Sequence, residues 1–130
     1  MFTHTLNKSW TTGAPADSVT SSVSASADGE DNRDIALGAS LTDVVVNLAA
    51  AYLKVKSLCI GSDVAVTVDT YLLTVKKNTI TIAAGSMFVW MTGDVGATPL
   101  SSDFDSIKLT NGDAVDGTVK IRMLVDSTPA

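Results

Sequence analysis

Few side chains in this sequence have the chemistry of a catalytic or metal-binding group. The 130 residues include a single histidine, His4, and a single cysteine, Cys59. A nucleophilic cysteine paired with a histidine also needs an orienting group and an oxyanion site, and no motif marks either one. Cys59 lies between Leu58 and Ile60, so we interpret it as a small core residue. A single cysteine also excludes a disulfide within the chain.

The most charged stretch, Asp28–Asp34, carries several oxygen ligands of the kind that bind Ca²⁺. An EF-hand loop needs alternating ligands, a central glycine and a bidentate glutamate at its end, and this stretch lacks that register. We therefore interpret it as a solvated turn in which Arg33 pairs with a neighbouring carboxylate. The sequence predicts no metal site here.

Two pairs of aspartates, Asp103 with Asp105 and Asp113 with Asp116, have the composition of a glycosidase pair. Such catalysis needs two carboxylates at a set separation in a cleft lined for sugar. Both pairs lie in loop-like stretches with few aromatic neighbours, and aspartate is a common turn former. We expect all four to be turn residues, and we expect no catalytic residue, no cofactor and no enzymatic activity.

Two tryptophans are candidates for contact with a ligand or with another protein. Trp90 lies inside the apolar run Met87–Met91, which predicts a core position or a subunit contact. Trp10 lies in the polar N-terminal region. It is therefore the better candidate for an interface residue.

The composition is typical of a single domain with an aliphatic core. Hydrophobic residues make up 45% of the chain and aromatic residues only 5%, so valine, isoleucine, leucine and alanine must fill the interior. The formal net charge is −5 and the longest basic run is Lys76-Lys77, so no nucleic-acid surface is expected. No apolar run approaches the roughly 20 residues that span a bilayer. The N-terminus lacks the pattern of a secretory signal, which indicates synthesis in a cytoplasm and no membrane partner.

Alternation of apolar and polar residues is the main structural signal. In Thr118–Val125, every second residue from Val119 onward is apolar. Successive side chains of a strand point to opposite faces, so this spacing predicts a strand with one buried face. The segment Ile107–Thr110 precedes it, and the connection between them is rich in Asn, Gly and Asp. Together they predict a final hairpin.

The whole chain is predicted to form about eight to ten short strands in an all-β, antiparallel β-sandwich of the jelly-roll type. Only Ala49–Leu53 has helical propensity, enough for a turn or two. One domain covers residues 1–130, with residues 1–35 as an N-terminal arm or peripheral strands. The shallow apolar face of Val19–Ala27 predicts an edge position or cover by another chain. The other expected strands are Thr3–Trp10, Asp43–Leu48, Val55–Ile60, Val64–Thr70, Asn78–Ala84 and Met87–Met91.

Nine short segments together resemble a known class of proteins. They are Glu30–Arg33, Val46–Ala49, Val55–Leu58, Ser62–Val64, Asn78–Gly85, Val89-Trp90, Leu100–Asp103, Ile107–Asn111 and Ile121–Asp126. As a set they resemble small all-β structural proteins of tailed-bacteriophage virions, of the type that decorate or cement the capsid. The resemblance covers roughly residues 28–127 and includes no catalytic signature.

This resemblance implies a β-sandwich that binds the assembled head as a homo-oligomer, with a trimer favoured, and bridges neighbouring major capsid subunits. The partner is then the major capsid protein, and the location is the virion surface after synthesis in the bacterial host cytoplasm. We select Phe2, Leu6 and Trp10 of the arm as contact residues, with Glu30 and Arg33 as polar contacts. Burial of apolar area across capsomer boundaries would resist the pressure of packaged DNA.

Two alternatives from other classes stay open at this point. The first is a tail- or fibre-associated module that binds host-surface carbohydrate. The second is a glycan-processing enzyme. Copies spaced regularly over the head favour decoration, copies at the tail tip favour the carbohydrate module, and polysaccharide turnover lost in Asp103→Asn favours the enzyme.

Overall fold

The computed structural model describes residues 1–13, 17–94 and 98–126. Within them, the chain forms ten strands and one turn of 3-10 helix, η1 (Tyr52–Lys54). The strands are β1 (Phe2–Thr11), β2 (Ser18–Ala27), β3 (Gly29–Leu37), β4 (Val44–Val46), β5 (Val55–Ser62), β6 (Val66–Leu72), β7 (Val75–Ile82), β8 (Ser86–Met91), β9 (Ser106–Asn111) and β10 (Gly117–Val125). The prediction of an all-β chain with eight to ten strands is confirmed. No helix in this part of the chain is long and apolar enough to cross a membrane.

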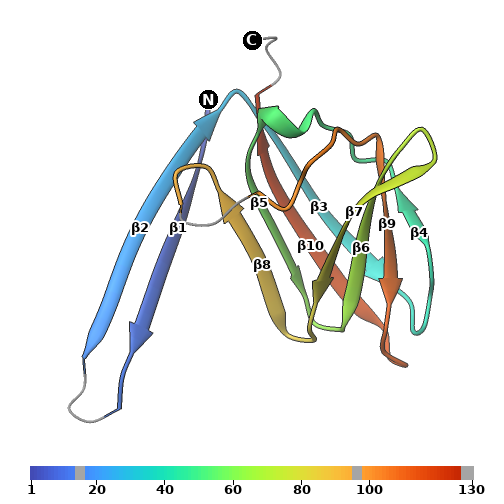
Figure 1. Cartoon of the computed structure of the whole chain (residues 1–130). Helices are drawn as coiled ribbons and strands as arrows, with labels where there is room; N and C mark the ends of the chain where they lie inside the picture. The colour runs from blue at the N-terminus through green and yellow to red at the C-terminus, as the bar shows by residue number, and fades with distance from the viewer. Residues whose placement is uncertain (14–16, 95–97, 127–130) are drawn as a thin grey trace.

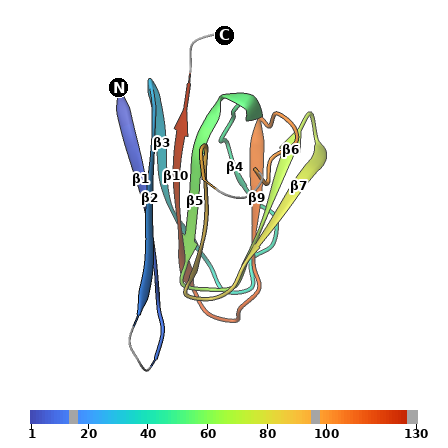
Figure 2. The same cartoon turned by 60° about the vertical axis from the view of Figure 1, so that its left-hand side comes forward.

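Eight of the strands form two antiparallel sheets that face each other as a sandwich (Figures 1 and 2). The strand orders are β3-β10-β5-β8 and β4-β9-β6-β7. The first strand of the set pairs with the last, and the pairing continues inward: β3 with β10, β4 with β9, β5 with β8, and β6 with β7. A chain paired in this way is one long hairpin rolled up on itself, which is the connectivity of a jelly roll.

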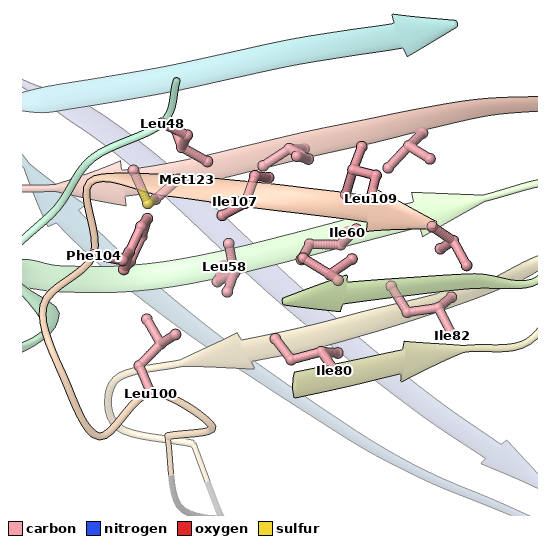
Figure 3. Packing of buried hydrophobic residues seen from close by; sticks show 14 of the residues in the cluster. Leu48, Leu58, Ile60, Ile80, Ile82, Leu100, Phe104, Ile107, Leu109 and Met123 are labelled. Carbon is pink, nitrogen blue, oxygen red and sulfur yellow. The ribbon is translucent and has the colours of Figure 1, made fainter. Parts of the chain in front are cut away.

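The core lies between the two sheets and is mainly aliphatic (Figure 3). In β10, Val119, Ile121 and Met123 are fully buried, as the alternation predicted. Leu109 from the opposite sheet is also fully buried, and Leu58 packs in the same cluster. Because side chains from both sheets interdigitate here, burial of aliphatic area holds the two layers together.

The predicted final hairpin is wrong, because β9 and β10 belong to different sheets. β9 pairs with β4 and β6, whereas β10 pairs with β3 and β5. The connection crosses from one sheet to the other, and the Asn111 side-chain amide donates to the backbone oxygens of Gly38 and Val115 at 3.0 and 2.8 Å. Nearness in sequence favours a hairpin. Pairing with earlier strands instead places the apolar faces of β9 and β10 on opposite sides of the core.

The prediction of a solvated turn over Asp28–Asp34 is also wrong, because residues from Gly29 onward form β3, an edge strand. An edge strand tolerates charge because one of its sides meets water. Charges are also paired locally, with Arg122 Nη2 lying 2.8 Å from Asp34 Oδ1 on the neighbouring strand. The expected pairing of Arg33 is confirmed, since its Nε donates to Asp31 Oδ1 at 2.6 Å.

The remaining two strands, β1 and β2, form a separate antiparallel hairpin. Its register is continuous, from Phe2 opposite Ala27 to Thr11 opposite Ser18. The hairpin lies along the outer side of the sheet that contains β3, β10, β5 and β8, and its far end extends beyond the sandwich (Figures 1 and 2). Residues 1–35 therefore divide between this hairpin and most of β3.

The turn between β6 and β7 predicts a stabilising double substitution. Leu73 and Thr74 have φ angles of 49° and 68°, a left-handed conformation that Asn-Gly adopts more readily in two-residue hairpin turns. We expect L73N/T74G to raise the free energy of unfolding by about 1 kcal/mol in urea titrations. Leu73→Ala keeps the unfavourable conformation and is expected to stay within about 0.5 kcal/mol of the wild type. A double variant no more stable than the wild type would contradict this account.

Candidate binding surface on the N-terminal hairpin

The two faces of the β1–β2 hairpin differ in chemistry because side chains alternate along each strand. The hydroxyl face consists of Thr3, Thr5, Asn7, Ser9 and Thr11 with Ser18, Thr20, Ser22, Ser24 and Ser26. Some of these hydroxyls bond across the strands, as between Thr3 Oγ1 and Ser26 Oγ at 2.8 Å. The mixed face consists of Phe2, His4, Leu6, Lys8 and Trp10 opposite Ala27, Ala25, Val23, Ser21 and Val19. Only the mixed face offers apolar contact.

One half of the mixed face packs on the sandwich. We call this half, residues 2–6 and 23–27, the hairpin base. The contact cluster consists of Ala25, Ala27, Met91 and Leu124, each at most 8% exposed, with Leu6 and Val23 packed against it. The alanine side chains are small, so the ribbon can approach the sheet closely. The base thus covers an apolar patch on the outer face of β10 and β8.

Polar contacts fix the position of the base. His4 Nδ1 lies 2.8 Å from Ser57 Oγ on β5, and His4 Nε2 lies 2.7 Å from Glu30 Oε2 on β3. The hydrogen bond with His4 is the main cause of the lowered pKa of Glu30. Farther along the hairpin, Lys8 Nζ lies 2.6 Å from Asp94 Oδ2, just beyond the end of β8. These contacts tie β1 to both edges of the sheet, at β3 and just beyond β8.

Ser57, His4 and Glu30 follow the order of nucleophile, base and carboxylate in a serine hydrolase, but their geometry differs. In that template, Nε2 of the imidazole faces the serine and Nδ1 faces the carboxylate. Here the ring is reversed, with Nδ1 toward Ser57. Ser57 is also only 4% exposed. We therefore interpret the three residues as a latch that holds the hairpin base on the sheet.

The four aspartates considered above as carboxylate pairs each accept a hydrogen bond from a backbone N–H of another segment. The donors are Tyr52 to Asp103, Leu73 to Asp105, Ala65 to Asp113 and Ala39 to Asp116, at 3.0, 3.1, 2.9 and 2.8 Å. They fasten separate loops to one another, a role beyond a local turn. Within residues 1–13, 17–94 and 98–126, no three His, Cys, Asp or Glu side chains are grouped so as to hold a metal ion.

An open groove of about 390 Å³ lies between the hairpin base and the outer face of the sheet, with His4, Thr5 and Leu6 on its hairpin side. One row of its lining runs across all four strands in register, from Asn32 through Arg122 and Cys59 to Val89. Met87 follows on β8 and is 63% exposed. The groove therefore presents apolar surface next to the patch that the base already covers.

Cys59 lines this groove, so the prediction of a core position is wrong. On β5, the neighbours Leu58 and Ile60 are buried in the core, and strand alternation turns Cys59 to the outer face. Burial raises the pKa of the Cys59 thiol, against an opposing effect of Arg122. A thiol with a raised pKa is mostly protonated at neutral pH and is a weak nucleophile.

Three of the five contact residues chosen from the sequence have partners within the chain. Leu6 packs in the hairpin base, and Glu30 accepts its hydrogen bond from His4. Arg33 Nη2 donates to Asp31 Oδ2 at 3.2 Å, in addition to its bond through Nε. The pairing of Arg33 with a neighbouring carboxylate was predicted from the sequence. The contacts of Leu6 and Glu30 were not, because their partners come from other strands.

The other two chosen residues, Phe2 and Trp10, are exposed. Their exposed fractions are 46% and 74%. Trp10 lies opposite Val19, which is 68% exposed, so the far half of the mixed face carries an uncovered apolar pair. Phe2 and Trp10 lie on the same face of β1, about 26 Å apart at roughly 3.3 Å per residue. The hairpin therefore presents two separate aromatic contacts.

The latch predicts that His4→Ala loosens the hairpin. The substitution leaves the buried Ser57 hydroxyl without this partner, which costs about 1–3 kcal/mol. A two-stranded hairpin is marginal by itself, so we expect faster amide hydrogen exchange throughout β1 and β2 and little change in β10. Thr5→Ala on the hydroxyl face is the matched control, with near wild-type exchange expected. Unchanged protection in His4→Ala would show that the latch does not hold the base.

The lowered pKa of Glu30 predicts that acid weakens the latch. A carboxylate whose pKa falls on folding adds stability above its usual value of 4.5, and this contribution is lost as pH drops through the lower folded value. In the wild type, we expect the protection of the β1 and β2 amides, corrected for intrinsic exchange, to decrease as the pH drops through the folded pKa of Glu30. Glu30→Gln should lack this step. A step of equal size in both proteins would assign it to another group.

Comparisons with known proteins give a similarity to one solved structure and no match of the other two kinds. No family model matches the chain, and no curated protein matches it. A solved structure of Bacillus endospore appendages, described as a novel family of disulfide-linked pili, is similar over 75% of this chain and 88% of that chain. The two sequences are 18% identical and the TM-score is 0.41. A similarity at this level carries no argument about function.

Proposed function

We propose that this protein is a non-enzymatic structural component of a tailed-bacteriophage virion, a decoration or cement protein that binds the capsid surface and bridges major capsid subunits. The observation that carries the proposal is the hairpin, which extends from a jelly-roll domain and presents the exposed residues Phe2 and Trp10. The choice of the capsid as the assembly rests on the resemblance of residues 28–127 to virion decoration proteins. The copies associate as a homo-oligomer, with a trimer favoured.

Bridging follows from the length of the hairpin. Phe2 and Trp10 lie near opposite ends of β1. The far end of the hairpin that β1 forms with β2 extends beyond the domain (Figure 1). The Phe2 end contacts the capsid subunit beneath the domain, and the Trp10 end reaches a neighbour. Burial of aromatic area supplies the affinity at each end, at about 25 cal/mol per Å² of apolar surface before the cost of association. Separating two capsid subunits then also requires breaking these contacts.

The fixed attachment of the hairpin supports this mechanism. The base is held by apolar packing around Leu124 and by the latch through His4, and Lys8 pairs with Asp94 farther out. An arm that is already ordered loses little conformational entropy when it binds. A small number of contact residues can therefore give useful affinity.

The test of this proposal is binding to purified heads that lack the protein. We expect cryo-electron microscopy of the mixture to show added density at regular positions over the head. Phe2→Asp is expected to weaken head binding by about tenfold or more, as for an aromatic anchor at an interface. Leu53→Asp is the matched control, because Leu53 is 73% exposed on η1 and lies outside the hairpin.

Two outcomes would contradict the proposal. Density at the tail tip, together with binding to host-surface carbohydrate, would favour a tail or fibre module. Absence of binding to heads by the wild-type protein would remove the capsid as its partner.

A further inference from the structure

The far half of the hairpin carries an apolar pair that nothing in the described part of the chain covers. Trp10 and Val19 face each other across β1 and β2 and are 74% and 68% exposed. They lie on the same mixed face as Leu6 and Val23, which pack on the sandwich. One half of a single surface is therefore buried within the chain and the other half is open. We call Trp10 and Val19 the hairpin tip.

The sheet has a surface of matching chemistry beside the hairpin base. The hairpin base covers Met91 and Leu124, and the same outer face continues into the groove with Val89 and Met87. Met87 is 63% exposed. The chemistry that the base meets, aliphatic and thioether side chains on β8 and its neighbours, is thus repeated in the groove.

The tip does not reach the groove of its own chain. The register of β1 and β2 is continuous and without a bulge, so the ribbon leaves the sheet in the direction that the base sets. The pair of Lys8 with Asp94 fastens it near the end of β8, and the far half then extends beyond the sandwich (Figure 1). Trp10 lies four residues past Leu6, about 13 Å farther along the strand. The tip and the groove of one molecule are therefore both open.

We propose that the hairpin tip of one copy docks in the groove of a second copy. The contact repeats between copies the packing that the base makes within the chain, with Trp10 and Val19 against Met87 and Val89. Charge complements it: Asp17 lies near the tip, and Lys120 lies in the row of the sheet next to the groove. Both are exposed. Asp34 lies opposite Lys120 in register, and its carboxylate pairs with Arg122. The inference rests on the part of the proposed function in which copies associate.

This contact is head-to-tail, because the tip and the groove are different surfaces. Such a contact closes into a ring when the rotation between copies allows it, and otherwise continues as an open chain. One tip buries less area than the roughly 1,200 Å² of a stable pairwise interface. Each single contact is therefore weak, and closure of a ring or attachment to a common surface strengthens it.

Chemical cross-linking captures weak contacts and distinguishes the possible arrangements. In a Cys59→Ser background, Val19 of the hairpin tip and Met87 of the groove are both replaced by cysteine (V19C/M87C). A mild oxidant then links copies that meet tip to groove. Each chain can join two neighbours, so we expect a ladder of dimers, trimers and larger species on denaturing gels. Adding Trp10→Asp should slow formation of the ladder at least tenfold, and adding Leu53→Asp should leave it unchanged.

The matched controls carry one cysteine or move the second one. V19C alone and M87C alone are expected to give little dimer. V19C/V45C places the second cysteine on β4 of the opposite sheet, where Val45 is 58% exposed, and is expected to give no ladder.

Several outcomes would overturn the inference. Equal dimer from V19C alone would indicate tip-to-tip contact, and a faster-migrating monomer from V19C/M87C would place the tip in its own groove. An equal ladder from V19C/V45C, or no ladder from V19C/M87C, would also exclude the proposed contact. Head binding by the unmodified protein is measured separately. A failure here therefore leaves attachment to the capsid untouched.

Discussion

Burial of Leu124 on the outer face of its sheet is the constraint on which the rest of the molecule depends. In β10, Val119, Ile121 and Met123 point into the core, yet Leu124 on the opposite side is also fully buried. A sheet with apolar side chains on both faces needs a second layer. The hairpin base provides it, with Ala25 and Ala27 directly in the same cluster.

The second layer explains why the hairpin has two halves with different roles. The apolar patch around Leu124 and Met91 occupies one end of the sheet, and only residues 2–6 and 23–27 are needed to cover it. The polar contacts of His4 and Lys8 then align the ribbon with the sheet. The part of the ribbon past Lys8 and Ser21 extends beyond what the fold requires. Apolar residues at these positions have no structural role within the described chain, which is why we assign them to contacts with other molecules.

Local pattern was sufficient for some elements and failed where partners are distant. Alternation predicted the buried face of β10 and placed most other strands, because it depends only on neighbouring residues. It also contained a signal for the hairpin, since Leu124 interrupts the otherwise polar face of β10. The pairing of β9 with β4 and β6 had no such signal, so nearness in sequence wrongly predicted a hairpin with β10.

The candidate site was harder to predict than the fold for the same physical reason. His4 meets Ser57 and Glu30, which lie 53 and 26 residues away in sequence. Glu30 belongs to a charged stretch that has the composition of a turn, and only pairing with β10 makes it an edge strand. Trp10 could be chosen from composition alone, because a tryptophan among serine and threonine residues has no core to enter.

A rigid arm also limits where its tip can bind. A two-stranded ribbon by itself is marginally stable in water. A free hairpin would therefore bend in many directions, and it would lose conformational entropy on binding any partner. Docking of the base removes that freedom during folding rather than during binding. The position of Trp10 is then set by packing around Leu124, which lies in register between the latch residues Glu30 and Ser57. A change at the base would therefore alter contacts at the tip without touching any residue there.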